Sequence, residues 1–229
     1  MNKRVLVLTG YTDSIEPPYG IDDQLMKPVF DLTLKSKIEY AKINNYDIMA
    51  LRSFGKDSAG IFNENKIGQL RFIRSFELLN IYDAVMWIDA DSLITNYSYK
   101  LEDFIDDSTT FVASYDWAGP HSFSTGNFII QKTPNLNKLI ELFYLYGPRF
   151  NSEQEVLNMI NYYSLHNGIK SLDYKFLGST PTKLQYGKGW ETRPEPKGPW
   201  TKDCFLVHLT GVSNTRRIEI LNTYFKEFL

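Results

Sequence analysis

The sequence contains almost no cysteine, no long hydrophobic run and no excess of charge of either sign. Cys204 is the only cysteine among 229 residues, so the chain cannot form an intrachain disulfide, and a reducing compartment is expected. No stretch approaches the roughly 20 apolar residues of a membrane helix, and Val5–Leu8 is too short for the apolar region of a signal peptide. We therefore expect a cytoplasmic protein or a soluble domain of a longer one.

The charge balance and the glycine pattern argue against two further classes of protein. Lys and Arg total 25 and Asp and Glu total 27, which leaves a net charge of −2 and no electrostatic footprint for a nucleic acid polymer. The chain also has no Gly-x-Gly-x-x-Gly, the phosphate-binding fingerprint of dinucleotide enzymes. Hydrophobic residues at 43% are typical of a globular protein, and the length suits one large domain, so we expect residues 1–229 to form a single domain.

The most informative stretch is an apolar run that ends in two carboxylates. Residues 84–88 read Ala-Val-Met-Trp-Ile, which predicts a strand buried on both faces of a sheet, and Asp89 and Asp91 follow it. In an open α/β sheet, ligands bind outside the carboxyl ends of the strands. Two acids one residue apart repel each other unless a cation lies between them, and carboxylates suit Mg²⁺ or Mn²⁺ held together with substrate phosphates. Because Asp is also a common turn residue, a plain turn is the alternative.

Alternating strand and helix patterns predict the rest of the fold. Arg4–Thr9 and Asp47–Leu51 have the composition of strands, and a helical spacing of apolar residues separates them over 32–43. An amphipathic helix over 67–79 leads into the central strand, and Tyr174–Leu177 is predicted as a late strand. We therefore predict an α/β protein, a Rossmann-like α/β/α sandwich around a mostly parallel, twisted sheet.

The loop after the first strand is a candidate nucleotide site. In a Rossmann-like sheet this loop commonly receives a nucleotide. Thr9, Tyr11 and Asp13 offer stacking and hydrogen-bonding groups there, although each residue singly suits an ordinary surface loop equally well.

A helix start farther along the chain presents two more polar side chains. Ser152 and Glu155 have the spacing of a capping box, in which each side chain bonds the other's backbone N–H. This leaves Glu153 and Gln154 in the first helical turn, pointing toward whatever lies at the helix N-terminus. Both suit the hydroxyl groups of a sugar, and Glu153 could act as a base.

Three segments together resemble GT-A fold glycosyltransferases. Residues 87–92, Trp-Ile-Asp-Ala-Asp-Ser, are similar to the Asp-x-Asp segment of glycosyltransferase family 8 and of the yeast-type galactosyl- and mannosyltransferases of family 34. Residues 152–158 resemble the Asp-Gln-Asp-x-Leu-Asn segment of family 8, with Glu153 where that family has Asp. Residues 208–211 resemble the late His-x-x-Gly of both families. The resemblance covers almost the whole chain and implies transfer of a sugar from a nucleoside-diphosphate sugar to a glycan or another hydroxyl acceptor.

The resemblance also implies roles for single residues. His208 would complete a metal site with Asp89 and Asp91, and an imidazole ligand favours Mn²⁺ over Mg²⁺. A satisfied core histidine is the alternative for His208. Arg71 would face the nucleotide, and Asn127 would approach the donor sugar.

The remaining nucleotide-binding candidates lie beside these motifs. They are Ala90, which lies between the two acids, Gly211 of the His-x-x-Gly segment, and Arg216. Arg216 and its neighbour Arg217 could meet the diphosphate, or they could equally be surface charges.

The two families retain the configuration of the anomeric centre, so the resemblance implies retention, with Gln154 near the reacting face. An inverting mechanism instead needs a carboxylate that takes the acceptor proton, for which Glu153 and Asp116 are the candidates.

Two other classes of function stay open. A haloacid-dehalogenase-like phosphatase also has an apolar strand that ends in Asp-x-Asp, and it would use Asp89 as the nucleophile and Asp91 as the acid/base. A non-catalytic nucleotide- or glycan-binding module would turn over no substrate.

Overall fold

The structure is a computed structural model that describes residues 3–12, 26–63, 66–116, 119–187, 190, 192, 196 and 198–229. For residues 116 and 119–121 it describes the backbone only. Of the predicted site residues, Asp13 therefore lies outside the described residues, and Asp116 is placed by its backbone alone.

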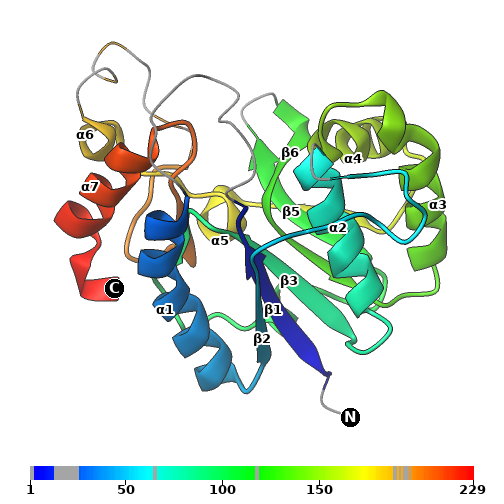
Figure 1. The fold of residues 1–229 in the computed structure, drawn as a ribbon, viewed down its shortest axis with the longest axis horizontal. Helices are drawn as coiled ribbons and strands as arrows, with labels where there is room; N and C mark the ends of the chain where they lie inside the picture. The colour runs from blue at the N-terminus through cyan, green and yellow to red at the C-terminus, as the bar shows by residue number, and fades with distance from the viewer. Residues whose placement is uncertain are drawn as a thin grey trace.

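A six-stranded sheet lies at the centre of the molecule (Figure 1). In spatial order its strands are β2 (Asp47–Leu51), β1 (Val5–Gly10), β3 (Ala84–Asp89), β6 (Gly119–Gln131), β5 (Phe111–Asp116) and β7 (Ile169–Leu172). Within this sheet β6 runs antiparallel to β3 and β5, whereas the other neighbouring pairs run parallel. The predicted mostly parallel sheet is confirmed.

A two-stranded antiparallel ribbon lies next to the end of β3. Its strands are β4 (Ser92–Ile94), which follows β3 after a short turn, and β8 (Leu206–His208). The register places Ser92 opposite His208. This pairing brings a residue from late in the chain beside the predicted acids.

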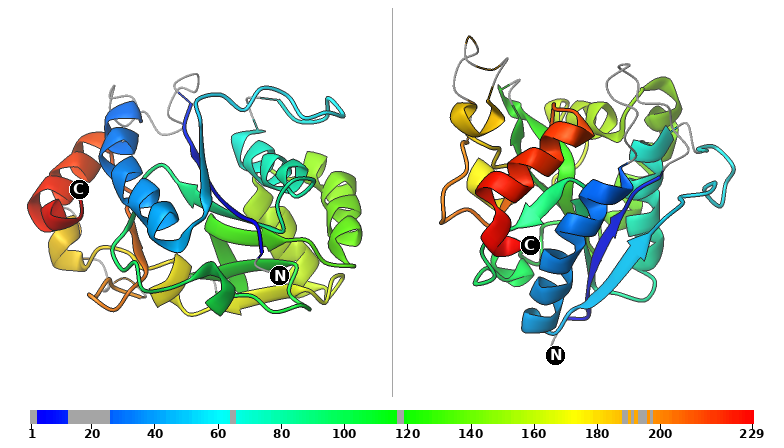
Figure 2. Two further views of the ribbon diagram at one scale, coloured as in Figure 1. Left: turned by 90° about the horizontal axis from the view of Figure 1, so that it is seen from below. Right: turned by 60° about the vertical axis from the view of Figure 1, so that its left-hand side comes forward.

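Helices cover both faces of the sheet (Figures 1 and 2). One face carries α2 (Ile67–Leu78), α3 (Leu136–Tyr146) and α4 (Glu153–Tyr162), and the other carries α1 (Lys27–Asn44) and the short α5 (Tyr174–Leu177). Beyond the sheet lie α6 (Lys183–Tyr186) and α7 (Asn214–Tyr224), and α7 packs beside α1. Single 3₁₀ turns occur at Leu101–Asp103, Gly147–Arg149 and Lys226–Phe228. None of the described helices is long and apolar enough to cross a membrane.

The central strand β3 is buried on both of its faces, as its apolar run predicts. Val85 and Trp87 pack into the core under α2, α3 and α4, whereas Met86 and Ile88 pack into the core on the α1 side. Because successive side chains of a strand point to opposite faces, Asp89 continues the side of Val85 and Trp87. The first acid is therefore aimed toward α2 and α4.

The strand predicted at residues 174–177 is wrong, because these residues form helix α5. The side chain of Asp173 accepts a hydrogen bond from the backbone N–H of Lys175 at 3.0 Å and so caps the first turn. This local cap favours the helix over the strand that the aromatic and apolar residues suggested.

Candidate functional site: two acids, a histidine and their arginines

Asp89 is held at the end of β3 by three side chains. Its Oδ1 atom accepts hydrogen bonds from Trp87 Nε1 at 2.7 Å and from Arg71 Nη1 of α2. Its backbone N–H donates to Oδ1 of Asn127 at 3.2 Å. Asn127 Nδ2 in turn donates to the carbonyl of Leu177 at 3.0 Å. The carboxylate of Asp89 is therefore fixed in direction, with Oδ1 occupied and Oδ2 left for another partner.

Asp91 is held in the same way from the opposite side. It is buried within the turn that joins β3 to β4, and its Oδ2 atom lies 2.9 Å from Arg217 Nη2 of α7. Arg217 is itself anchored, because its Nε donates to the carbonyl of Leu209 at 2.9 Å and its Nη1 to Oδ1 of Asn214 at 2.6 Å. Burial alone raises the pKa of Asp91, but Arg217 and His208 lower it further than burial raises it, so Asp91 is ionised.

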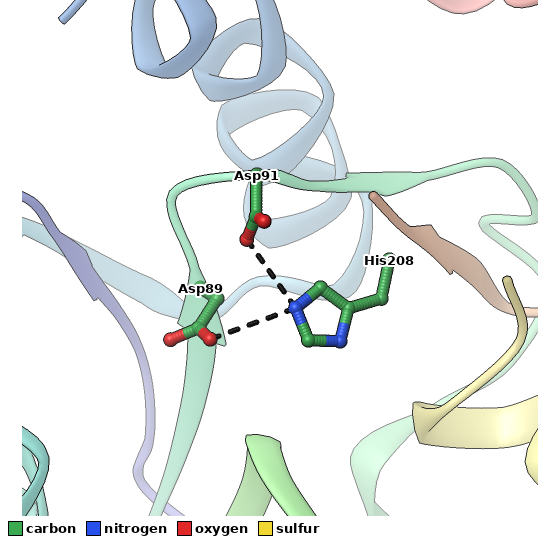
Figure 3. Close-up of side chains that lie close together, drawn as sticks. All are labelled: Asp89, Asp91 and His208. Atoms are coloured by element: carbon green, nitrogen blue, oxygen red, sulfur yellow. Dashed lines mark ion pairs between the residues drawn. The ribbon is translucent and has the colours of Figure 1, made fainter. Parts of the chain in front are cut away.

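His208 faces, on each carboxylate, the oxygen that the arginine does not contact. Its Nε2 atom lies 3.3 Å from Asp91 Oδ1 and 3.7 Å from Asp89 Oδ2, and Figure 3 shows the ring edge pointing between the two acids. Burial lowers the pKa of His208, but the charge and hydrogen bond of Asp91 and the charge of Asp89 raise it above the ordinary value.

Gly126 of β6 leaves the space that the His208 ring fills. A Cβ atom at position 126 would lie 2.3 Å from Cε1 of His208 and 3.0 Å from Oδ2 of Asp89. Any larger residue would therefore displace the imidazole from its place between the acids. The packing of the site therefore explains why a glycine precedes Asn127.

Three donor atoms, one from each side chain, fit a divalent cation. One ligand atom from each of Asp89, Asp91 and His208 lies within 4.8 Å of the other two. Neighbouring ligands of an octahedral cation with bonds of about 2.1 Å are separated by about 3 Å, close to the two distances from His208 Nε2. Two carboxylate oxygens and an imidazole nitrogen are a donor set that suits Mn²⁺.

Glu153 and Gln154 lie at the N-terminus of α4, which the predicted capping box of Ser152 and Glu155 begins. Glu153 is 1% exposed, and its Oε1 accepts hydrogen bonds from Arg71 and, at 2.7 Å, from Thr125 Oγ1. Gln154 Oε1 accepts the backbone N–H of Thr125 at 3.3 Å, next to Gly126. Arg71 thus joins the buried Glu153 to the half-buried Asp89 in one chain of ion pairs.

The residues predicted around the first loop divide between core and site. Thr9 is fully buried at the end of β1, and its hydroxyl has no hydrogen-bond partner among the described residues. The Tyr11 ring packs on Phe30, with ring centres 4.8 Å apart, in a small cluster that includes Ala90. Tyr11 and Ala90 are thus brought next to the acids, whereas the Thr9 side chain is enclosed.

The two neighbouring arginines of α7 have different surroundings. Arg216 donates to the backbone carbonyls of Tyr186 and Gln185 and pairs with Glu219, so none of its hydrogen bonds reaches the acids. Arg217 is the one that contacts Asp91. Gly211 has a φ of 79°, and Trp190 is the nearest side chain to its missing Cβ position, 4.0 Å away.

Sequence reasoning missed Lys37 of α1. Its side chain is fully buried, and Nζ lies 3.0 Å from Thr33 Oγ1 and 3.4 Å from the carbonyl oxygen of Ala90. Burial lowers its pKa to about 7, although the charges of Asp91 and Asp89 oppose this shift. The signal was present in the sequence, because positions 30, 33, 37, 40 and 41 have the spacing of one helix face, and Lys37 lies on that otherwise inward face.

Comparisons with known proteins agree with this fold. No protein-family model and no curated protein sequence matches the chain. Among solved structures, a glycosyltransferase involved in the glycosylation of the major capsid of PBCV-1 matches with a TM-score of 0.64 at 16% identity, covering 96% of this chain and all of that one. The galactosyltransferase LgtC, in complex with donor and acceptor sugar analogues, matches with a TM-score of 0.54 at 11% identity, covering 98% of this chain and all of that one.

A third structure, the glycosyltransferase GlyE of Streptococcus pneumoniae, matches with a TM-score of 0.50 at 16% identity. The match covers 98% of this chain and 64% of GlyE. At identities this low, the structural similarity establishes the fold alone: the chain has the GT-A fold of glycosyltransferases, as the sequence resemblance implied.

Proposed function

We propose that this protein is a metal-dependent glycosyltransferase that moves a sugar from a nucleoside-diphosphate sugar to a glycan or another hydroxyl acceptor. The observation that carries this proposal is the convergence of Asp89 Oδ2, Asp91 Oδ1 and His208 Nε2 on one point beside the carboxyl ends of β1 and β3. An open α/β sheet binds its ligands at this edge. The solved structures with the same fold, one of them holding donor and acceptor sugar analogues, support the same chemistry.

The bound cation, Mn²⁺ or Mg²⁺, would supply a Lewis acid that neutralises the charge developing on the leaving diphosphate. The chain's own residues prepare the site for it. Arg71 and Arg217 each occupy one oxygen of an acid, so the other oxygen of each faces His208. Because three protein atoms would leave about half of the positions of an octahedral cation open, the phosphates of the donor could complete the ligand set.

The surroundings of Glu153 support retention of the anomeric configuration. Glu153 is enclosed and paired with Arg71 and Thr125, which disfavours it as a base for the acceptor hydroxyl. Gln154, beside Gly126, is the proposed side chain at the reacting face. Proton NMR of the first-formed product should show the anomer of the donor. An inverted anomer would contradict retention and direct attention to Asp116, which ends β5.

The experiment that tests the function is metal-dependent release of nucleoside diphosphate. A panel of nucleoside-diphosphate sugars is incubated with the protein and Mn²⁺, with and without sugar acceptors, and the released diphosphate is measured. Asp91→Asn should keep the fold and reduce release by about a hundredfold, because it removes a charge that would hold the cation, and loss of a group that only orients a metal ligand already costs about 10–100-fold. Asp107→Asn is the matched control, because that side chain is fully exposed.

The same assay separates the alternatives. A binding module would bind nucleotide and metal without releasing any product, and a phosphatase would release inorganic phosphate from phosphomonoesters. The GT-A fold favours the glycosyltransferase over the phosphatase.

A further inference from the structure

Helix α1 turns a polar stripe, not an apolar one, toward the end of β3. Thr33, Ser36 and Lys37 are each at most 1% exposed, and they lie against the segment from Ala90 to Ile94. Ser36 Oγ accepts the backbone N–H of Ile94 at 3.2 Å and donates to the carbonyl of Thr33 at 2.8 Å. The stripe therefore binds backbone groups of the chain that carries the two acids.

The hydrogen bonds of Thr33 and Lys37 have a defined direction. In its protonated form Lys37 can only donate, and its Nζ then donates to Thr33 Oγ1 at 3.0 Å. The single hydroxyl hydrogen of Thr33 then has two acceptors, the carbonyl of Ala90 at 2.6 Å and that of Phe30 at 3.2 Å. The shorter bond goes to Ala90, and Lys37 Nζ also lies 3.4 Å from the carbonyl oxygen of Ala90. Lys37, Thr33 and the Ala90 carbonyl thus form one hydrogen-bond chain.

This hydrogen-bond chain ends on Ala90, the one residue of the turn that has no polar side chain. The backbone N–H of Asp89 is held by Asn127, and the backbone carbonyl of Asp91 accepts the N–H of Leu209 at 3.0 Å. The Ala90 carbonyl is the backbone group that lies between these two fixed points. A rotation of the Ala90 peptide would turn the two carboxylates apart, because they leave the backbone on either side of it.

Burying a lysine in a core costs more free energy than burying an apolar side chain of similar size. Lysine is almost never fully buried without a partner, and an apolar side chain of the same length would pack there without the desolvation penalty. In Lys37 that penalty is accepted directly behind the acids, next to the Phe30 ring, whose centre is 5.6 Å from Nζ. Packing alone does not account for this choice of residue.

We propose that Thr33 and Lys37 are positioning residues that hold the Ala90 carbonyl, so that Asp89 and Asp91 keep their free oxygens aimed at the same point as His208 Nε2. This inference rests on the proposed function, because it assumes that the three atoms hold a divalent cation. The two residues touch neither substrate nor cation and act through the turn alone.

The test is the affinity for Mn²⁺ alone, measured as the loss of the free Mn²⁺ signal in electron paramagnetic resonance. Thr33→Val removes the hydroxyl at nearly constant shape, and Thr33→Ser keeps it as the matched control. Lys37→Met removes the donor, and Lys35→Met is its control, since Lys35 lies on the exposed side of the same helix. Melting temperatures of all variants establish that each is folded.

Thr33→Val and Lys37→Met should each weaken Mn²⁺ binding about tenfold or more, the usual effect of removing a group that orients a metal ligand. Thr33→Ser and Lys35→Met should stay within about twofold of the wild type, since neither changes the chain of bonds. The double variant Thr33→Val/Lys37→Met should be no weaker than the worse single variant, because both act through one carbonyl.

Two results would overturn the inference while leaving the proposed function intact. Equal Mn²⁺ affinities of Thr33→Val and Thr33→Ser would show that the hydroxyl has no positioning role. Tighter Mn²⁺ binding by Lys37→Met would show that Lys37 acts only as a repelling charge. The proposed metal site itself fails if the wild type does not bind Mn²⁺, or if Asp91→Asn leaves that binding unchanged. This inference would then fail with it.

Discussion

At the scale of single residues, each of the two acids is paired with an arginine of its own. Arg71 approaches Asp89 from α2, and Arg217 approaches Asp91 from α7. Each arginine contacts one carboxylate oxygen and offsets one negative charge. The two acids can therefore lie close together before any cation is bound, because each arginine offsets part of their mutual repulsion.

Replacing Arg217 tests this compensation. Arg217→Met should lower the free energy of unfolding by about 3 kcal/mol, because it leaves the buried carboxylate of Asp91 without its counter-charge. Urea denaturation in the presence of a chelator measures the loss. The neighbouring change Arg216→Met is the control and should cost only about 1 kcal/mol, since the bonds of Arg216 go to backbone carbonyls and to the exposed Glu219. Equal losses would mean that the Asp91 pair does not carry the stabilisation.

At the scale of elements, three separate pieces of backbone deliver the donor atoms. β3 brings Asp89, the turn into β4 brings Asp91, and the pairing of β4 with β8 brings His208 opposite Ser92. A fourth element, α4, aims its first turn at the same place, with Gln154 bonded to the backbone of β6. The start of α4 is set by its cap, so the cap affects the site through the position of this turn.

Removing the cap of α4 should destabilise the protein without destroying it. Ser152→Ala deletes the hydroxyl that accepts the N–H of Glu155 at 3.2 Å, and this should lower the free energy of unfolding by about 1 kcal/mol. Ser152→Asp keeps a capping oxygen and should remain within a few tenths of a kcal/mol of the wild type. Urea titrations of the three proteins check the prediction, and an Asp variant as unstable as the Ala variant would count against the cap.

At the scale of the whole molecule, the buried Lys37 makes stability depend on pH. Its pKa is about 7 in the folded protein and near 10.4 in an unfolded chain. Between these values the unfolded state binds a proton that the folded state does not, so the unfolding free energy rises as pH increases from about 7 to about 10. Below pH 7 both states are protonated, and this contribution becomes constant.

Lys37→Met should abolish that rise. Relative to the variant, the wild type should gain up to about 1.4 kcal/mol per pH unit between pH 7 and pH 9, measured by urea denaturation with a chelator present. The charged groups that act on Lys37 are Asp91 and Asp89, and their charges oppose the lowering of its pKa by burial. Parallel stability profiles for the wild type and the variant would contradict the prediction.

Much of the fold follows from local patterns in the sequence. The apolar run before Asp89 is long enough only for a strand and too continuous for a half-exposed one, so burial on both faces follows from residue order. The capping box at Ser152 and the left-handed Asn45 that ends α1 are also local, since each is decided by bonds within a few residues. The strand predicted over Tyr174–Leu177 is wrong because the cap from a single Asp outweighed the strand-like composition.

The sequence by itself determined that two acids end a buried strand, and its resemblance to known families pointed to His208. Only the tertiary structure decided which charges meet them. Arg216 and Arg217 are adjacent in the chain and point in different directions, so the packing of α7 selects Arg217 for Asp91. Arg71 and Glu153 are 82 positions apart, and Lys37 reaches Ala90 across 53 positions. A sequence pattern reports periodicity along one element, whereas the pairing of buried charges depends on how separate elements pack, and no local pattern contains that information.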